Sequence, residues 1–104
     1  MTVGAVDKVS CLHLLASAGP EALDACRSQC RPGDAVLLID AAVLHLLKPG
    51  MDTLVSTGCR LYCLNHDLEA HGLSAAIESS PANPVDDSRF PGLLREHDHC
   101  LSWT

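Results

Sequence analysis

The sequence predicts one α/β domain, with a mainly parallel sheet of four to five strands and helices on both faces. Short aliphatic runs alternate with segments of helical pattern, which is typical of parallel strands joined by helical crossovers. Residues 35–40 (AVLLID) are aliphatic at five consecutive positions, as in a strand that is covered on both faces. Hydrophobic residues make up 47% of the 104 positions and aromatic residues only 3%, so we expect an aliphatic core.

The predicted elements follow one another from residue 10 onward. Residues 1–9 are expected to form a loose leader before a domain over 10–104. The predicted strands are 10–17, 35–40, 59–65 and a weak one at Val85–Asp86, and the predicted helices are 20–30, 41–47, 51–58, 68–72 and 90–100.

Local signals justify these boundaries in turn. Pro20 suits the first turn of a helix, and the segment 31–34 (RPGD) ends that helix before the second strand. Pro49 and Gly50 end the next helical stretch, and Asp67 can cap the helix that begins at residue 68. The last four residues, LSWT, are assigned to no element.

Charge and hydropathy exclude several classes of function. The formal net charge is −6, and the seven basic residues are scattered between Lys8 and Arg95, so we expect no direct nucleic-acid partner. No uncharged apolar run approaches the roughly 20 residues of a membrane span, and the first ten residues do not resemble a secretion signal. We therefore expect a cytoplasmic protein without a membrane partner, whose six cysteines are not paired in structural disulfides.

Cofactor and metal signals are weak. The turn at 16–23 (ASAGPEAL) has one glycine and lacks both the dinucleotide and the P-loop pattern, so no cofactor is expected. Cys59 and Cys63 are spaced C-x3-C, and His97, His99 and Cys100 cluster near the end, which leaves a metal-binding module as an alternative. The competing interpretation is that such cysteines are free and buried in an apolar core. We assign no metal ligand.

Thiol chemistry is the third candidate. Cys26 and Cys30 are four residues apart in a predicted helix, so both side chains should lie on one helix face. They are either reactive or two small residues that pack under the second strand. His13 and His66 are predicted at the ends of strands, where ligands gather in open α/β sheets, although either could be an ordinary solvated histidine.

Beyond residue 10, the order of these features resembles the DsrH/TusB family. Leu-His is followed by a loop, a helix with Leu-x-x-Cys, and a strand that begins after Gly-Asp. The tail resembles the family pattern of Val-Asp, Phe, Leu, Glu-x-Asp and a final Trp. The matching residues are Leu12, His13, Leu23, Cys26, Gly33, Asp34, Val85, Asp86, Phe90, Leu94, Glu96, Asp98 and Trp103.

The resemblance implies a DsrE/F/H-like fold and a subunit of a sulfur-relay complex. Two related sister subunits, DsrE/TusD-like and DsrF/TusC-like, are expected to complete a heterohexamer that hands persulfide sulfur to a downstream acceptor protein. The pathway implied first is 2-thiolation of the tRNA wobble uridine, and dissimilatory sulfur oxidation is the other. Some members carry a cysteine on the first helix, at the position of Cys26, which makes it the candidate sulfur acceptor.

The sequence also departs from the family pattern. Apolar residues 14–18 replace a polar segment after the histidine, and residues 40–44 (DAAVL) replace an acidic-Gly-aromatic turn. We therefore do not expect this chain to act as an enzyme alone. The alternative function is a non-catalytic α/β interaction module or metal-binding module.

Overall fold

The fold is built on one parallel sheet, which confirms the predicted α/β class. The computed structural model describes residues 10–48, 51–56 and 58–103, so the predicted leader at 1–9 lies outside the described residues. The strands are β1 (Cys11–Leu15), β2 (Ala35–Leu38), β3 (Arg60–Leu64), β4 (Asn83–Val85) and β5 (His99–Trp103). They lie in the order β4-β3-β2-β1-β5, and every neighbouring pair is parallel.

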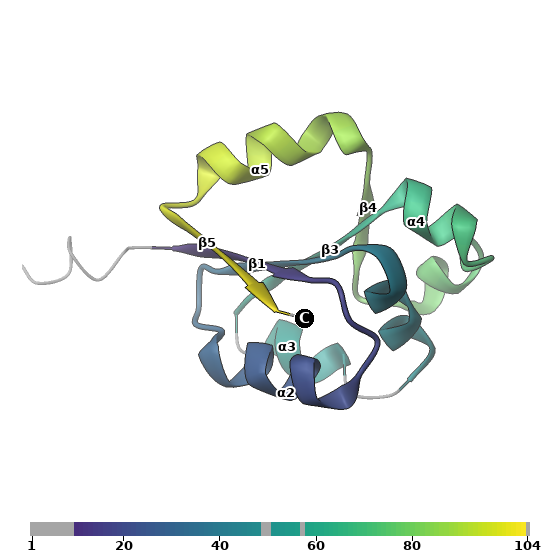
Figure 1. The fold of residues 1–104 in the computed structure, drawn as a ribbon, viewed down its shortest axis with the longest axis horizontal. Helices are drawn as coiled ribbons and strands as arrows, with labels where there is room; N and C mark the ends of the chain where they lie inside the picture. The colour runs from purple at the N-terminus through teal and green to yellow at the C-terminus, as the bar shows by residue number, and fades with distance from the viewer. Residues whose placement is uncertain (1–9, 49–50, 57, 104) are drawn as a thin grey trace, which may run out of the picture.

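Helices cover both faces of this sheet. Helices α2 and α3 lie on one face and α5 lies on the other (Figure 1). The α-helices are α2 (Pro20–Gln29), α3 (Met51–Ser56), α4 (Asn65–Ala70) and α5 (Phe90–Glu96), and the 3-10 helices are η1 (Asp40–Leu47), η2 (Ala76–Ser79) and η3 (Asp87–Arg89). As predicted, Pro20 occupies the first turn of α2.

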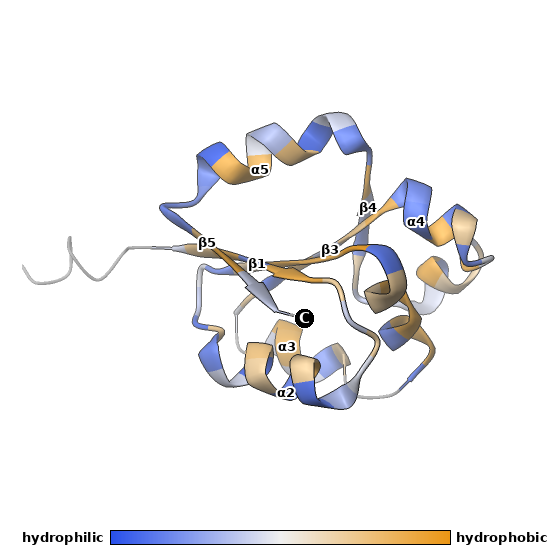
Figure 2. Ribbon diagram, viewed as in Figure 1, coloured by the Kyte–Doolittle hydropathy of each residue, from blue (hydrophilic) through white to orange (hydrophobic). Residues whose placement is uncertain are grey.

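The core is aliphatic and divided by the sheet into two clusters. Successive side chains of a strand point to opposite faces, so alternate residues of β2 enter different clusters. Val36 and Leu38 belong to the cluster that includes Cys26 of α2, whereas Ala35 and Leu37 belong to the cluster that includes Leu93 of α5. All four residues of β2 are fully buried. Much of β1 and β3 is coloured hydrophobic in Figure 2, whereas the end of β5 is pale.

The end of the chain corrects one prediction. The segment 90–100 was expected to be helical throughout, but α5 ends at Glu96 and His99–Trp103 forms a fifth strand beside β1. The Asp98 carboxylate accepts the backbone N–H of Ser10, and the N–H groups of Asp98 and His99 donate to the carbonyl of Ser10. These contacts with a segment almost 90 residues away override the helical pattern.

Asp67 also acts differently from the prediction. Helix α4 begins earlier than expected, with Leu64 at the N-cap position and no side-chain cap. Asp67 lies in the first turn, and its carboxylate accepts the backbone N–H of Asp40 at 2.8 Å. Asp40 has a φ of 50°, which is in the left-handed region of backbone conformation. The bond from its N–H to Asp67 helps to hold this backbone conformation just after β2. The segment that follows is a 3-10 helix.

Candidate functional site: a thiol pair beside a buried histidine

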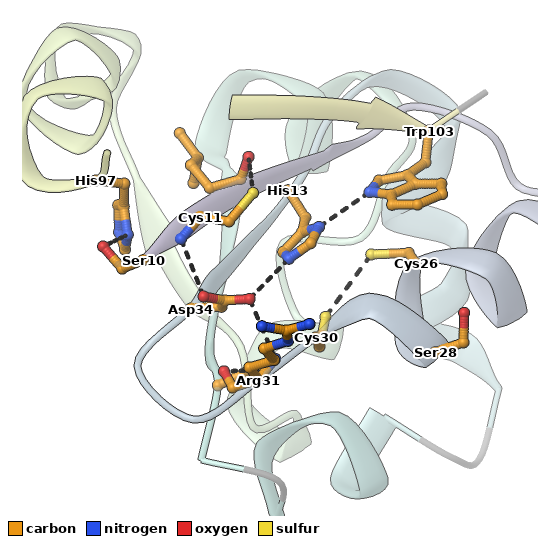
Figure 3. A network of polar contacts seen from close by, with 12 residues as sticks. Ser10, Cys11, His13, Cys26, Ser28, Cys30, Arg31, Asp34, His97 and Trp103 are labelled. Atoms are coloured by element: carbon orange, nitrogen blue, oxygen red, sulfur yellow. Dashed lines mark hydrogen bonds and ion pairs between the residues drawn. The ribbon is translucent and has the colours of Figure 1, made fainter. Parts of the chain in front are cut away.

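Two cysteines meet at the carboxyl end of α2. Cys26 is fully buried, Cys30 is half-buried, and their Sγ atoms are 4.0 Å apart (Figure 3). Both are free thiols. Cys30 is the C-cap residue with extended backbone, and its N–H donates to the carbonyl of Arg27. The prediction that the two thiols share one helix face is therefore confirmed, although Cys30 lies at the boundary of the helix.

His13 lies against this pair, in the middle of β1 rather than at the end of the strand as predicted. Its side chain is 1% exposed, and both ring nitrogens have partners. Nε2 is 3.0 Å from the Asp34 carboxylate, and Nδ1 is 3.0 Å from the indole nitrogen of Trp103 (Figure 3). The indole can only donate, so Nδ1 accepts and Nε2 carries the proton that is donated to Asp34. The network therefore requires a neutral imidazole.

Asp34 is the centre of this network. It is 3% exposed, and its carboxylate accepts the backbone N–H groups of Cys11 at 2.9 Å and Arg31 at 3.1 Å, in addition to His13. Burial by itself raises the pKa of Asp34, but these three hydrogen bonds outweigh it and the pKa is lowered. The carboxylate thus ties the loop after α2 to β1.

The thiol of Cys30 holds its proton firmly. The pKa of Cys30 is raised far above its usual value, first by its hydrogen bond with Cys26 and then by burial, while His13 opposes the shift. Cys30 therefore keeps its proton, and either thiol of the pair can donate to the other. Burial lowers the pKa of His13, but Cys30 and Asp34 raise it above the usual value. Protonation of Nδ1 would break the bond from Trp103, so the ring stays neutral while that bond holds.

The same residues form a group of potential metal ligands. One nitrogen of His13 and the sulfurs of Cys26 and Cys30 all lie within 4.8 Å of one another. Both nitrogens of His13 are already engaged, so a metal ion there would have to displace Trp103 or Asp34.

The residues considered as metal ligands from the sequence are different from these three. In the described parts of the chain, no group of three or more potential ligands includes Cys59, Cys63, His97, His99 or Cys100. The thiols of Cys59 and Cys63 contact backbone carbonyls instead, and His97 pairs with the hydroxyl of Ser10.

A pocket opens next to this network. It measures about 590 Å³, and His13, Asp34, Arg31 and Cys11 are among its lining residues. It lies where β1 and β5 begin, at the amino ends of the strands, opposite to the edge that the general rule for α/β sheets favours. His66, the other histidine predicted at a strand end, lines a separate hollow of about 330 Å³.

The sequence comparisons identify the family to which this chain belongs. A family model described as "DsrH like protein" matches residues 16–100, which include α2, Asp34 and the start of β5. The chain belongs to the DsrH family. Two curated DsrH relatives are named Protein TusB. The one from Pectobacterium parmentieri is 33% identical over 95 residues, which cover 88% of this chain and 99% of that protein. The one from Photorhabdus laumondii is 32% identical over 73 residues, which cover 68% and 76%.

A solved structure supports the fold of this DsrH-family chain. The crystal structure of the ychN protein from E. coli matches with a TM-score of 0.71 and covers 91% of this chain and 99% of that one. The sequence identity is 14%, so this likeness concerns the fold alone. Within the described residues of our chain, no helix combines the length and apolar character needed to cross a membrane.

Proposed function

We propose that the chain is a subunit of a cytoplasmic sulfur-relay complex that passes persulfide sulfur toward 2-thiolation of the tRNA wobble uridine. Membership of the DsrH family, with a TusB relative aligned over almost its whole length, supports this function. Two sister subunits, DsrE/TusD-like and DsrF/TusC-like, would complete a heterohexamer, and a downstream acceptor protein would take the sulfur. Dissimilatory sulfur oxidation is the second pathway, and the partner proteins determine which of the two pathways the complex serves.

Within this complex we assign sulfur acceptance to Cys26. The observation that carries the assignment is the thiol pair, in which the Cys30 thiol keeps its proton and its Sγ lies 4.0 Å from the Sγ of Cys26. A protonated thiol in this position can donate a hydrogen bond to the Cys26 sulfur when that sulfur becomes the attacking nucleophile. The Cys26 thiolate would attack the terminal sulfur of a donor persulfide and expel the donor's thiolate.

The alternative is a non-catalytic interaction module in which Cys26 only packs. Cys26 is completely buried in the core cluster that also contains Val36 and Leu38, and this burial favours the alternative. Sulfur acceptance therefore requires the last turn of α2 to open. That turn is held by the 3.3 Å bond from Cys30 to Arg27 and by the Ser28 hydroxyl, which donates to the carbonyl of Ala25, while the residues at 28 and 29 are exposed.

Intact-mass spectrometry separates the two functions. The chain is incubated with a cysteine desulfurase and cysteine, and the wild type is compared with Cys26→Ala and with Cys100→Ser, which removes an exposed thiol. Sulfur transfer predicts a gain of about 32 Da, the mass of one sulfur, on wild type and Cys100→Ser but not on Cys26→Ala. Equal labelling of all three proteins, or no change of mass in any of them, would contradict the assignment. Co-purification with co-expressed sister subunits tests the complex separately.

A further inference from the structure

We propose that Cys30 is a resolving thiol, which attacks a persulfide on Cys26, releases sulfide and leaves a Cys26–Cys30 disulfide. The step rests on the proposed sulfur acceptance by Cys26. It adds a second reaction, in which the chain discharges its sulfur when no acceptor takes it.

Distance and backbone geometry carry the proposal. The two sulfurs are already in van der Waals contact at 4.0 Å, whereas a disulfide bond measures about 2 Å. A helical rise over four residues separates the Cα atoms by about 6 Å, which lies within the range that disulfides bridge. Cys30 is the C-cap residue, so its approach strains the final 3.3 Å bond to Arg27 rather than the bonds within the body of α2. The pair can therefore close without unwinding the body of α2.

Other thiols are less well placed for this attack. Cys11, Cys59 and Cys63 donate to backbone carbonyls of Leu12, Arg31 and Asn83. Among the cysteines, all of which the structure describes, the hydrogen-bonded partner of Cys26 is Cys30.

The reaction balances without an external oxidant. The sulfur of Cys30 attacks the Sγ of Cys26, the bond between that Sγ and the terminal sulfur breaks, and the terminal sulfur leaves with the bonding pair. The two cysteine sulfurs are oxidised to a disulfide, and the sulfane sulfur is reduced to hydrosulfide, which takes the proton that Cys30 loses. A dithiol reductant of the thioredoxin class would then restore both thiols.

Loading leaves this geometry in place. The inner sulfur of a persulfide on Cys26 is the Sγ atom itself, which lies 4.0 Å from the Sγ of Cys30. The hydrogen bond with Cys26 and burial raise the pKa of Cys30, so the Cys30 thiol loses its proton in the course of the attack rather than before it.

The test loads each protein once with sulfur and then follows the fate of the persulfide over time. Wild type, Cys30→Ser and Cys100→Ser are loaded by a cysteine desulfurase and cysteine, then desalted into anaerobic buffer without thiols. Intact mass and free sulfide are measured over time. Wild type and Cys100→Ser should lose the added 32 Da, fall about 2 Da below the starting mass, and release one sulfide per loaded chain. Cys30→Ser should keep its persulfide about tenfold longer or more and form no intramolecular disulfide.

Two results would overturn the proposal in distinguishable ways. A wild-type persulfide as long-lived as that of Cys30→Ser, with no sulfide released, would refute the resolving role while leaving sulfur acceptance intact. Failure of Cys30→Ser to acquire any sulfur would refute acceptance by Cys26 itself. Peptide mapping of the species about 2 Da lighter must find Cys26 joined to Cys30, and any other pairing would also refute the proposal.

Discussion

Replacement of Asp34 by Asn probes the buried network that surrounds the thiol pair. The carboxylate accepts three hydrogen bonds, from two backbone N–H groups and from Nε2 of His13. An amide has one acceptor oxygen, so its NH2 group must face at least one of these buried or part-buried donors. A change of tautomer at His13 gives no relief, because a proton on Nδ1 would then face the indole N–H of Trp103.

The expected loss of stability follows from these contacts. One buried donor without an acceptor costs about 1–3 kcal/mol, and hydrogen bonds to a charged group are stronger than those to a neutral amide. We therefore expect Asp34→Asn to lower the free energy of unfolding by about 2–4 kcal/mol. For a domain of this size, that corresponds to a fall in Tm of at least about 8 °C.

Urea denaturation at pH 7, followed by far-UV circular dichroism and by the fluorescence of Trp103, measures this loss. The matched control is Asp24→Asn, which makes the same change of charge on the exposed surface of α2. Its ion pair with Arg27 is solvent-exposed, so its removal should cost less than about 0.5 kcal/mol. If both variants lose equally little stability, the network does not hold the fold together and the reasoning is refuted.

Three further predictions concern the same region. Trp103→Phe keeps the aromatic ring but removes the indole donor from a buried imidazole nitrogen, and should cost about 1–2 kcal/mol in urea denaturation. The pKa of Asp34 is lower in the folded state than in the unfolded state, so its stabilising contribution is complete above the unfolded pKa and is lost as pH falls through the folded pKa. The urea midpoint should therefore fall toward acid pH, and it should change less with pH in Asp34→Asn than in wild type. Cys26→Ala should fold cooperatively with a loss of about 1–2 kcal/mol from a small cavity, and a loss above about 4 kcal/mol would instead favour a purely structural role.

The sequence predicted those parts of the fold whose signals are local. The aliphatic run of β2 reports burial on both faces, and Pro20 marks the start of α2, so both elements were placed correctly. Strand β5 carries no such signal, because four of its five residues are exposed at the sheet edge and show no buried alternation. Its pairing depends on contacts with Ser10, which no local pattern encodes.

The same division applies to the site. A spacing of four residues within a helix brought Cys26 and Cys30 together correctly, because helical geometry fixes that relation. Asp34 and Trp103 were noted only as matches to a family pattern, and His13 was noted as such a match and as a histidine at a predicted strand end. Their contacts span 21 and 90 positions, and only the strand order places them side by side. The network that surrounds the thiols therefore emerged only from the structure.

The place of β5 has a consequence for how the chain folds as it is synthesised. Of the described strands, β1 is made first and β5 last, yet the two are neighbours in the finished sheet. Strands β1 to β4 can pair as they leave the ribosome, but one edge of β1 stays open until residues 99–103 have emerged. Contacts between such distant segments form slowly, and an unpaired strand edge invites association with other chains. We therefore expect docking of β5 to be the late step of folding, and His13 to acquire its indole partner only then.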